Sequence, residues 1–266
     1  MRALRVGPLL TAVALTACVD GLSPASERTG FISATTVNIG AGPNYAVTFV
    51  GAFYRYDGLE VGFEPPETCQ AYVYSSLPVP IASFPTIDAG DRLITTISGR
   101  QDTLLKTNAL GVTSYQLAGT IGSVPLTPGD TLSIVIPGAL AGFPAATVRV
   151  RTSEPFTFDP VGTAGETQPV PVTWTAAPAP GSVMLFYLRF SSLSTTDEPN
   201  TEIRCAFTDD GSGSVPVPFS SAWSAAPPGS RSVVVQRARL STVSLDSKTR
   251  VSLLSFFDRP LPVGTP

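Results

Sequence analysis

Short runs of β-branched and aromatic residues recur along this chain between clusters of Gly, Pro, Asp and Ser. No stretch of ten or more residues combines a 3.6-residue apolar period with a capping residue at its start. Several short runs of this kind, separated by turn residues, are typical of β-sandwiches or β-barrels. The sequence therefore predicts an all-β fold, with strands at Tyr45–Tyr56, Cys69–Ser75, Arg92–Ile97, Thr131–Ile136, Thr147–Arg151, Val183–Phe190, Glu202–Thr208, Ser232–Arg237 and Arg250–Phe257.

Similar motifs follow one another in the same order in the two halves of the chain. Val37–Pro43 parallels Val172–Pro178, and a lone cysteine follows a Glu-Pro pair in each half, at Cys69 and at Cys205. A repeat of this length indicates two related structural units. We therefore expect two tandem β-sandwich domains, immunoglobulin-like or jelly-roll-like. Residues 32–158 form the first, with extra hairpins, and 171–266 form the second after a linker at 159–170.

The first residues have the layout of an export signal. Arg2 and Arg5 precede an apolar stretch, Val6–Ala17, that is shorter than the roughly 20 residues a membrane-spanning helix needs. Residues 1–17 are therefore expected to be a signal peptide. Residues 18–31 would then be a tether that leads to the first domain.

Leu15-Thr16-Ala17-Cys18 resembles the lipobox of bacterial lipoproteins. The resemblance implies cleavage before Cys18 and lipidation of that cysteine, and two or more acyl chains anchor a protein stably. Val19 stands where many lipoproteins of the inner membrane have Asp, which favours the outer membrane, at its periplasmic face or the cell surface. The alternative is an ordinary secretory signal that contains a cysteine.

The charge of the chain limits its partners. Loss of residues 1–17 removes two of the 17 basic residues and none of the 20 acidic ones, which leaves a formal charge of −5. An acidic chain is a poor partner for nucleic acid or anionic lipid head groups. The partners expected are the membrane, through the lipid anchor, and a cell-wall glycan or an envelope protein.

Cys69 and Cys205 are the cysteines that remain after Cys18. Strand alternation places Cys205 on the apolar side of its run with Ile203 and Phe207, and the matching side at Cys69 carries Ala71 and Val73. If the two cysteines occupy equivalent core positions in separate domains, their Cα atoms are too far apart for a disulfide. We therefore expect two buried free thiols, against the disulfide that export to an oxidising space would favour.

Tyr72 and Tyr74 project from the face opposite Cys69 and form an aromatic strip at positions i and i+2. Tyrosines offer apolar area with a polar rim, on which sugar rings stack. The strip is a candidate ligand-binding surface; the alternative is that an extra hairpin or the neighbouring domain covers it.

Acidic residues gather in loops beside both cysteines. Calcium takes six to eight oxygen ligands, so these loops are candidate Ca²⁺ sites, although none fits a defined calcium-binding loop. The alternative is that Asp210-Gly211 forms a hairpin turn and that the other carboxylates keep loops soluble. The residues are Asp57, Glu60, Glu64, Glu67, Asp197, Glu198, Glu202, Asp209 and Asp210.

The chain contains no histidine, which removes the Ser-His and Cys-His nucleophile pairs and the commonest zinc ligand. Its two lysines, Lys106 and Lys248, do not follow a serine by three positions, so a Ser-x-x-Lys base is absent as well. We therefore expect no enzyme and no catalytic residues. The predicted function is a non-catalytic binding or structural module. The alternatives are carbohydrate binding on Tyr72 and Tyr74, or glycan cleavage by two carboxylates.

Overall fold

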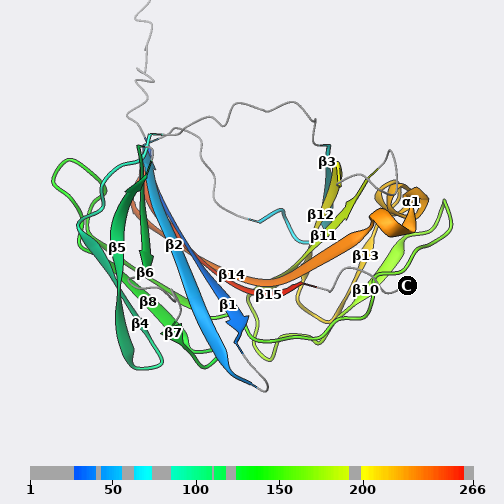
Figure 1. Ribbon diagram of the computed structural model, residues 1–266, viewed down its shortest axis with the longest axis horizontal. Helices are drawn as coiled ribbons and strands as arrows, with labels where there is room; N and C mark the ends of the chain where they lie inside the picture. Colours follow the sequence, from blue (N-terminus) through cyan, green and yellow to red (C-terminus); the bar gives the residue numbers. More distant parts are fainter. Residues whose placement is uncertain are drawn as a thin grey trace, which may run out of the picture.

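The computed structural model describes residues 27–39, 43–55, 63–73, 85–109, 111–117, 124–191 and 199–260. Most of these residues form strands, which confirms the all-β prediction (Figure 1). The elements are β1 (Arg28–Asn38), β2 (Tyr45–Arg55), β3 (Thr68–Val73), β4 (Arg92–Ile97), β5 (Arg100–Ala109), β6 (Val112–Leu117), β7 (Val124–Pro125), β8 (Thr131–Ile136), β9 (Ala146–Arg151), β10 (Val170–Thr173), β11 (Ser182–Phe190), β12 (Thr201–Thr208), β13 (Ser212–Val215), α1 (Phe219–Ala225), a 3₁₀ turn (Pro228–Ser230), β14 (Ser232–Asp246) and β15 (Thr249–Pro260).

Thirteen of the strands in the described part of the chain belong to one sheet, with the order β3-β12-β11-β14-β15-β1-β2-β6-β5-β4-β8-β9 and β7 beside β2. The long strands β14 and β15 join two arms (Figure 1). The first arm contains β1, β2 and β4 to β9. The second contains β3, β11 and β12, and the separate pair of β10 and β13 lies beside it. β1 runs parallel to β15, with Arg28 opposite Thr249.

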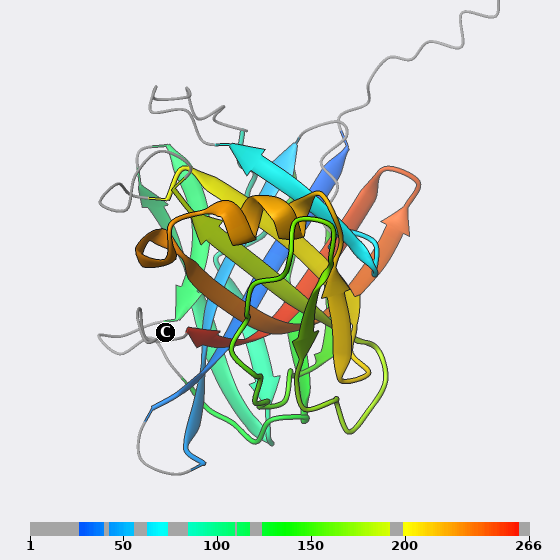
Figure 2. The ribbon, with the colours of Figure 1, turned by 90° about the vertical axis from the view of Figure 1, so that its right-hand side faces the viewer.

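Two hydrophobic cores share β15. Val251 and Leu253 belong to the core of the first arm, with Ile32 and Phe53 among others, whereas Phe257 belongs to the core of the second. Since these β15 residues are odd-numbered, both cores lie on the same face of the strand. Figure 2 shows α1, β10 and β13 lying over the sheet of the second arm on its core side.

The opposite face of the joining strands is concave and looks into the space between the arms (Figure 1). Leu185, Ala206 and Ala238 are buried there beneath Phe63 and Phe256. The rings of Phe63 and Phe256 meet edge to face, with centroids 6.1 Å apart. We call this surface, on β3, β12, β11, β14 and β15, the concave face.

The two separate sandwiches expected from the repeat are not confirmed. One sheet passes through both predicted halves, because β15 supplies core residues to the first arm and β3 pairs with β12 of the second. Pairing between strands far apart in sequence leaves no local pattern from which it could have been predicted.

Two segments expected to be extended connections are partly structured. β1 begins at Arg28, inside the predicted tether. In the predicted linker, Val161 and Ala164 pack against the second core, and Phe158 just before it forms a bridge with Trp174. The connection between the arms thus packs against the core of the second arm.

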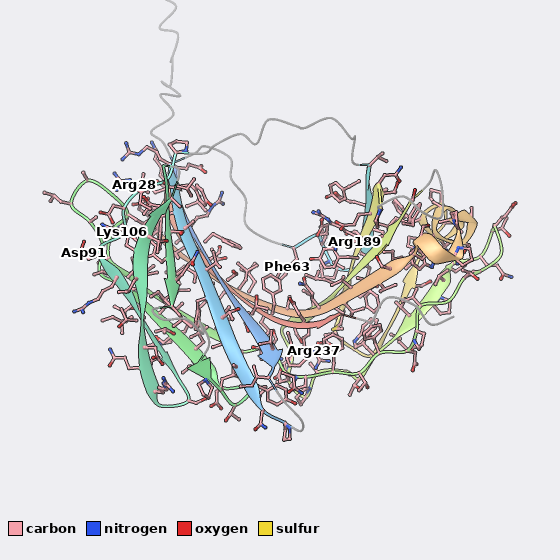
Figure 3. The ribbon with its side chains drawn as sticks, viewed as in Figure 1. Arg28, Phe63, Asp91, Lys106, Arg189 and Arg237 are labelled. Carbon is pink, nitrogen blue, oxygen red and sulfur yellow. A yellow bond between two sulfur atoms is a disulfide. The ribbon has the colours of Figure 1, made fainter. Side chains whose placement is uncertain are left out.

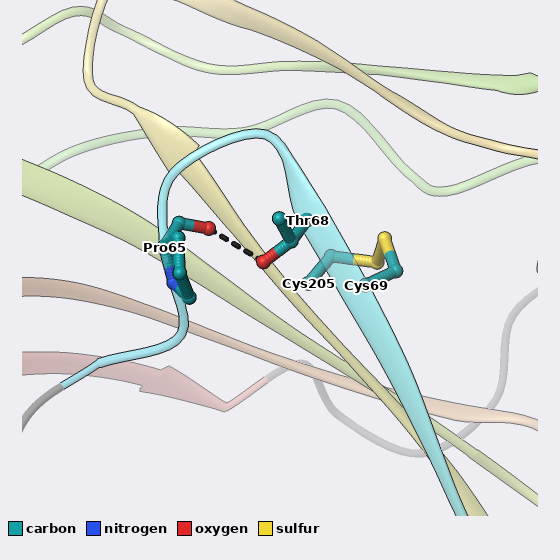
Figure 4. The surroundings of a disulfide bond; sticks show 4 residues. All are labelled: Pro65, Thr68, Cys69 and Cys205. Atoms are coloured by element: carbon teal, nitrogen blue, oxygen red, sulfur yellow. Dashed lines mark hydrogen bonds between the residues drawn. A yellow bond between two sulfur atoms is a disulfide. The ribbon is translucent and has the colours of Figure 1, made fainter.

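The prediction of free thiols is wrong, because Cys69 and Cys205 form a disulfide (Figure 4). The two cysteines lie directly opposite each other on the antiparallel neighbours β3 and β12. Their Cα atoms are 4.1 Å apart, well within the distance of about 7 Å beyond which a disulfide cannot close. The expectation failed because it placed the two strands in different domains.

Candidate functional site

A cluster of charged and aromatic side chains lies on the concave face of the second arm. Glu202 on β12 stands opposite Tyr72 on β3 and Arg189 on β11, and Arg204 stands opposite Tyr187 on β11. Residues directly opposite each other in a sheet share a face, so the register brings all five together. Figure 3 places Arg189 on the concave side of this arm. We call Tyr72, Tyr187, Arg189, Glu202 and Arg204 the charged cluster.

Glu202 is the centre of the charged cluster and is only 2% exposed. Arg189 Nε donates to its Oε2 at 2.5 Å, and Arg204 Nε donates to its Oε1 at 2.5 Å. A buried carboxylate is tolerated when charge-assisted hydrogen bonds of this kind satisfy it. The three side chains together carry one net positive charge.

The aromatic rings fix the two arginines further. The Arg204 guanidinium carbon lies 4.3 Å from the centroid of the Tyr72 ring and 6.0 Å from that of Tyr187. The Arg189 guanidinium carbon also lies 6.0 Å from the Tyr187 centroid. Cations within about 6 Å of a ring face are attracted by its quadrupole, so both guanidinium groups are held in place before any ligand arrives.

Two titratable groups of this face, Tyr187 and Asp258, have raised pKa values. Burial raises the pKa of Tyr187 to about 12; Arg204 opposes the shift, and Glu64, Glu202 and Asp258 add to it. Burial also raises the pKa of Asp258, against a hydrogen bond that Gln236 Nε2 donates to it at 2.8 Å. Tyr187 is therefore a neutral phenol with a proton to donate at physiological pH.

The structure changes the predicted aromatic strip. Tyr72 lies on the face of β3 opposite Cys69, as expected, and this is the concave face. It is half-buried, and Arg204 covers one face of its ring. Its hydroxyl can donate a hydrogen bond to Gln70 Oε1, at 2.8 Å, or to Glu64 Oε1, at 3.3 Å. Tyr74 lies outside the described residues. Tyr72 is thus part of an arginine site and not a bare platform.

The other face of β3 is less buried than alternation suggested. Cys69 is half-buried against the second core, but Ala71 is exposed and Val73 is 76% exposed. β3 is the last strand of the sheet, so nothing in the described structure covers the outer half of this face. Alternation gives the face on which a side chain lies, but burial also needs a neighbouring layer.

Acidic residues of these loops that lie in the described ranges form hydrogen bonds within the chain. Glu67 Oε1 accepts a hydrogen bond from the Thr208 backbone, and Asp210 Oδ1 accepts one from the Ser212 backbone in the β12–β13 turn. No group of three or more metal-ligating side chains occurs within the described ranges. Four of the acidic residues named for calcium lie outside these ranges: Asp57, Glu60, Asp197 and Glu198.

Buried ion pairs on the core side of β14 were not predicted. Arg237 Nε donates to Asp209 Oδ2 at 2.7 Å, and Trp174 Nε1 donates to Asp209 Oδ1 at 2.9 Å. Arg239 Nη2 donates to Glu154 Oε2 at 3.0 Å. The Arg239–Glu154 pair ties the start of the connection between the arms to β14, and the Arg237–Asp209 pair ties the turn between β12 and β13 to the same strand. The alternation of arginine with Ala238 along β14 is the one sign of these pairs in the sequence.

A further polar cluster lies on the first arm, where Figure 3 labels Asp91 and Lys106. Lys106 Nζ contacts Asp88 at 3.0 Å and Asp91 at 3.4 Å, and the buried Tyr115 hydroxyl donates to Asp88 or to the Gly90 carbonyl. Burial raises the pKa of Asp88, but hydrogen bonds from Gly90, Lys106 and Tyr115 outweigh it and the pKa is lowered. The cluster fastens the loop before β4.

Cys18, the predicted lipidation site, lies outside the described residues. No helix in the described part of the chain has the length and apolar character needed to cross a bilayer.

No known family model, curated protein or solved structure matches this chain. The charged cluster therefore has to be interpreted from its own geometry. It presents fixed cationic and aromatic groups on a face rather than a nucleophile with a base, an arrangement suited to binding.

Proposed function

We propose that this chain is an exported, lipid-anchored protein of the bacterial cell envelope that binds its ligand on the concave face without catalysing a reaction. The observation that carries the proposal is the charged cluster, in which buried Glu202 holds Arg189 and Arg204 from two sides. Binding groups that are already ordered lose little conformational entropy when a ligand arrives. Such pre-organisation is the feature expected of a recognition surface.

The hydrogen bonds of Glu202 support the proposal that the protein has no catalytic role. Glycan cleavage by two carboxylates needs one that protonates a leaving group and one that attacks or activates water. Both oxygens of Glu202 accept hydrogen bonds from arginine side chains, so both are already engaged within the protein. It is therefore poorly suited to be the acid of such a pair.

Export and anchoring are supported by two separate features. The lipobox-like Leu15-Thr16-Ala17-Cys18 implies lipidation, and disulfides such as Cys69–Cys205 persist in oxidising compartments outside the cytosol. Val19 after the cysteine favours the outer membrane. A mass spectrum of the N-terminal peptide tests the anchor: we expect a peptide that begins at Cys18 and carries lipid, and an unmodified peptide with another start would contradict it.

Carbohydrate is the ligand class that we propose first, because Tyr72 and Tyr187 combine ring surface with a phenol beside the arginines. The test is co-sedimentation with purified cell-wall polysaccharide and a glycan array. Arg204→Gln should weaken binding, since it removes the cation between the two rings, while Arg149→Gln on the exposed side of β9 serves as the matched control. Equal binding by both variants and the unmodified protein would place the ligand elsewhere.

A further inference from the structure

The Arg189 guanidinium forms its hydrogen bond within the described chain through Nε and lies beside the Tyr187 ring. Its Nε contacts Glu202, while its two terminal Nη groups have no hydrogen bond or ion pair with any described residue, and the side chain is 45% exposed. The guanidinium is planar, and the free edge formed by Nη1 and Nη2 matches the two oxygens of a carboxylate. Arg189 thus presents a fixed pair of donors to a ligand on the concave face.

The charge around this edge favours a single negative charge in the ligand. Arg189, Arg204 and Glu202 sum to one positive charge, and Glu64 and Asp258 on the same face oppose further negative charge. A carboxylate carries one charge at neutral pH, whereas a phosphate monoester carries close to two. The carboxyl groups of Glu64 and Asp258 therefore disfavour a doubly charged phosphate monoester more than a singly charged carboxylate.

The position of Arg189 within the sheet favours a sugar over a peptide. β11 is paired with β12 on one side and with β14 on the other, so no backbone groups are open beside Arg189 for an added peptide strand. The neighbouring Tyr187 offers a ring and a hydroxyl that bonds no other described residue. A ring next to a hydrogen-bond donor suits a sugar, which has apolar faces and many hydroxyl groups.

We propose that Arg189 binds the carboxylate of an acidic sugar, so that the ligand of the concave face is a glycan that contains uronic acids. This inference rests on the proposed function and deepens it. Arg189 sets the specificity for acidic over neutral glycan, while Tyr187 contacts the sugar that carries the carboxylate.

The test is calorimetric titration of the full chain with a soluble polyuronate and with the same polymer after its carboxyl groups have been reduced to alcohols. A charge-assisted bidentate contact predicts affinity about 10- to 100-fold weaker for the reduced polymer. Arg189→Gln should lose a similar factor for the polyuronate and nothing for the reduced polymer. Arg189→Lys, which keeps the charge without the paired donors, should fall between, and Arg149→Gln should match the unmodified protein.

The outcomes separate this inference from the proposed function. Equal affinity for both polymers, unaffected by Arg189→Gln, would overturn the inference and leave glycan binding in place. Equal binding of a sulfated polymer would overturn the carboxylate assignment, and tighter binding of polyglutamate would overturn the glycan. Binding to no glycan at all would overturn both. In Arg189→Gln, Glu202 keeps its ion pair with Arg204, so its buried charge stays compensated. The comparison of the two polymers uses the unmodified protein and does not depend on the folding of any variant.

Discussion

Arg237 has no exposed surface, and acceptor oxygens surround its guanidinium. Besides Asp209, it donates to the backbone carbonyls of Pro155 and Thr175, which lie on either side of the predicted linker. The side chain therefore neutralises a buried carboxylate and fixes the connection between the arms at once. Removal of one partner of a buried pair leaves the other charge uncompensated.

We expect Arg237→Gln to lower the free energy of unfolding by about 3–5 kcal/mol, the usual cost of an orphaned buried charge. Arg100→Gln is the matched control, because Arg100 pairs with Asp102 at the surface and surface pairs contribute at most about 1 kcal/mol. Denaturant unfolding of the two variants and the unmodified protein measures the difference. Equal losses in both variants would contradict the structural role of Arg237.

Asp258 predicts a pH dependence. Its pKa is raised by burial above the ordinary 3.8, so the folded protein binds this proton more tightly than the unfolded chain does. Stability from this group is therefore greatest below about pH 4 and falls as the pH rises through the folded pKa. Asp258→Asn should be more stable than the unmodified protein at pH 7, with the difference lost near pH 3.5, as thermal unfolding across this range would measure.

Asp246 is the control for that experiment, because its pKa is shifted the other way. The Lys248 backbone donates a hydrogen bond to Asp246 at 2.7 Å and is the main cause of its lowered pKa. Stability from Asp246 is present above about pH 4 and lost as the pH falls through the folded pKa. Asp246→Asn should thus be less stable than the unmodified protein at pH 7. If Asp258→Asn and Asp246→Asn changed the stability at pH 7 in the same direction, these assignments would be contradicted.

At the scale of elements, β3 depends on its disulfide. It is a six-residue edge strand that pairs only with β12 within the described chain, and it carries Tyr72 of the charged cluster. The Cys69–Cys205 bridge spans a sequence separation of 136 residues, and such long loops gain the most from closure.

We expect the double variant Cys69→Ser with Cys205→Ser to lose about 2–5 kcal/mol of stability. Amide hydrogen exchange should rise first in β3, while β8, in the core of the first arm, should keep its protection at early times. Mass-spectrometric exchange of peptides from the two strands measures this. Unchanged protection in β3 would mean that its backbone pairing suffices without the bridge.

The sequence predicted strands best where apolar residues alternate with exposed ones. β4 and β8 have the predicted bounds, and β11 and β12 differ by one residue at their starts. β14 was predicted to end at Arg237 but continues to Asp246, because Arg237 and Arg239 are buried through ion pairs that no local pattern encodes.

The charged cluster was predicted only through Tyr72. Its arginines come from β11 and β12, and the side of Tyr72 was correctly inferred from alternation. The contact of Tyr72 with Arg204 depends on the pairing of β3 with β12, which joins residues far apart in sequence. Pairing of this kind follows from tertiary packing, so residue types and spacing could not supply it.

For the whole molecule, the shared sheet predicts one unfolding unit. β14 and β15 contribute to both cores, so neither arm keeps its core when the other unfolds. We expect a single calorimetric transition whose van't Hoff and calorimetric enthalpies agree. The fragment 32–158, which lacks Val251 and Leu253, should not unfold cooperatively by itself. Two separate transitions, or a folded fragment, would instead support the tandem domains expected from the repeat.

The parallel pairing of β1 with β15 also determines when the protein can finish folding. β1 cannot complete its pairing until β15 is available, because Ile32 stands opposite Leu253 in the register. Contacts between such distant residues slow folding, since a long loop must close before they form. During synthesis, the other strands of the first arm therefore leave the ribosome before the strand that completes their core. This delay suits a protein that we propose is exported, since it leaves time for translocation before the last strand closes the fold.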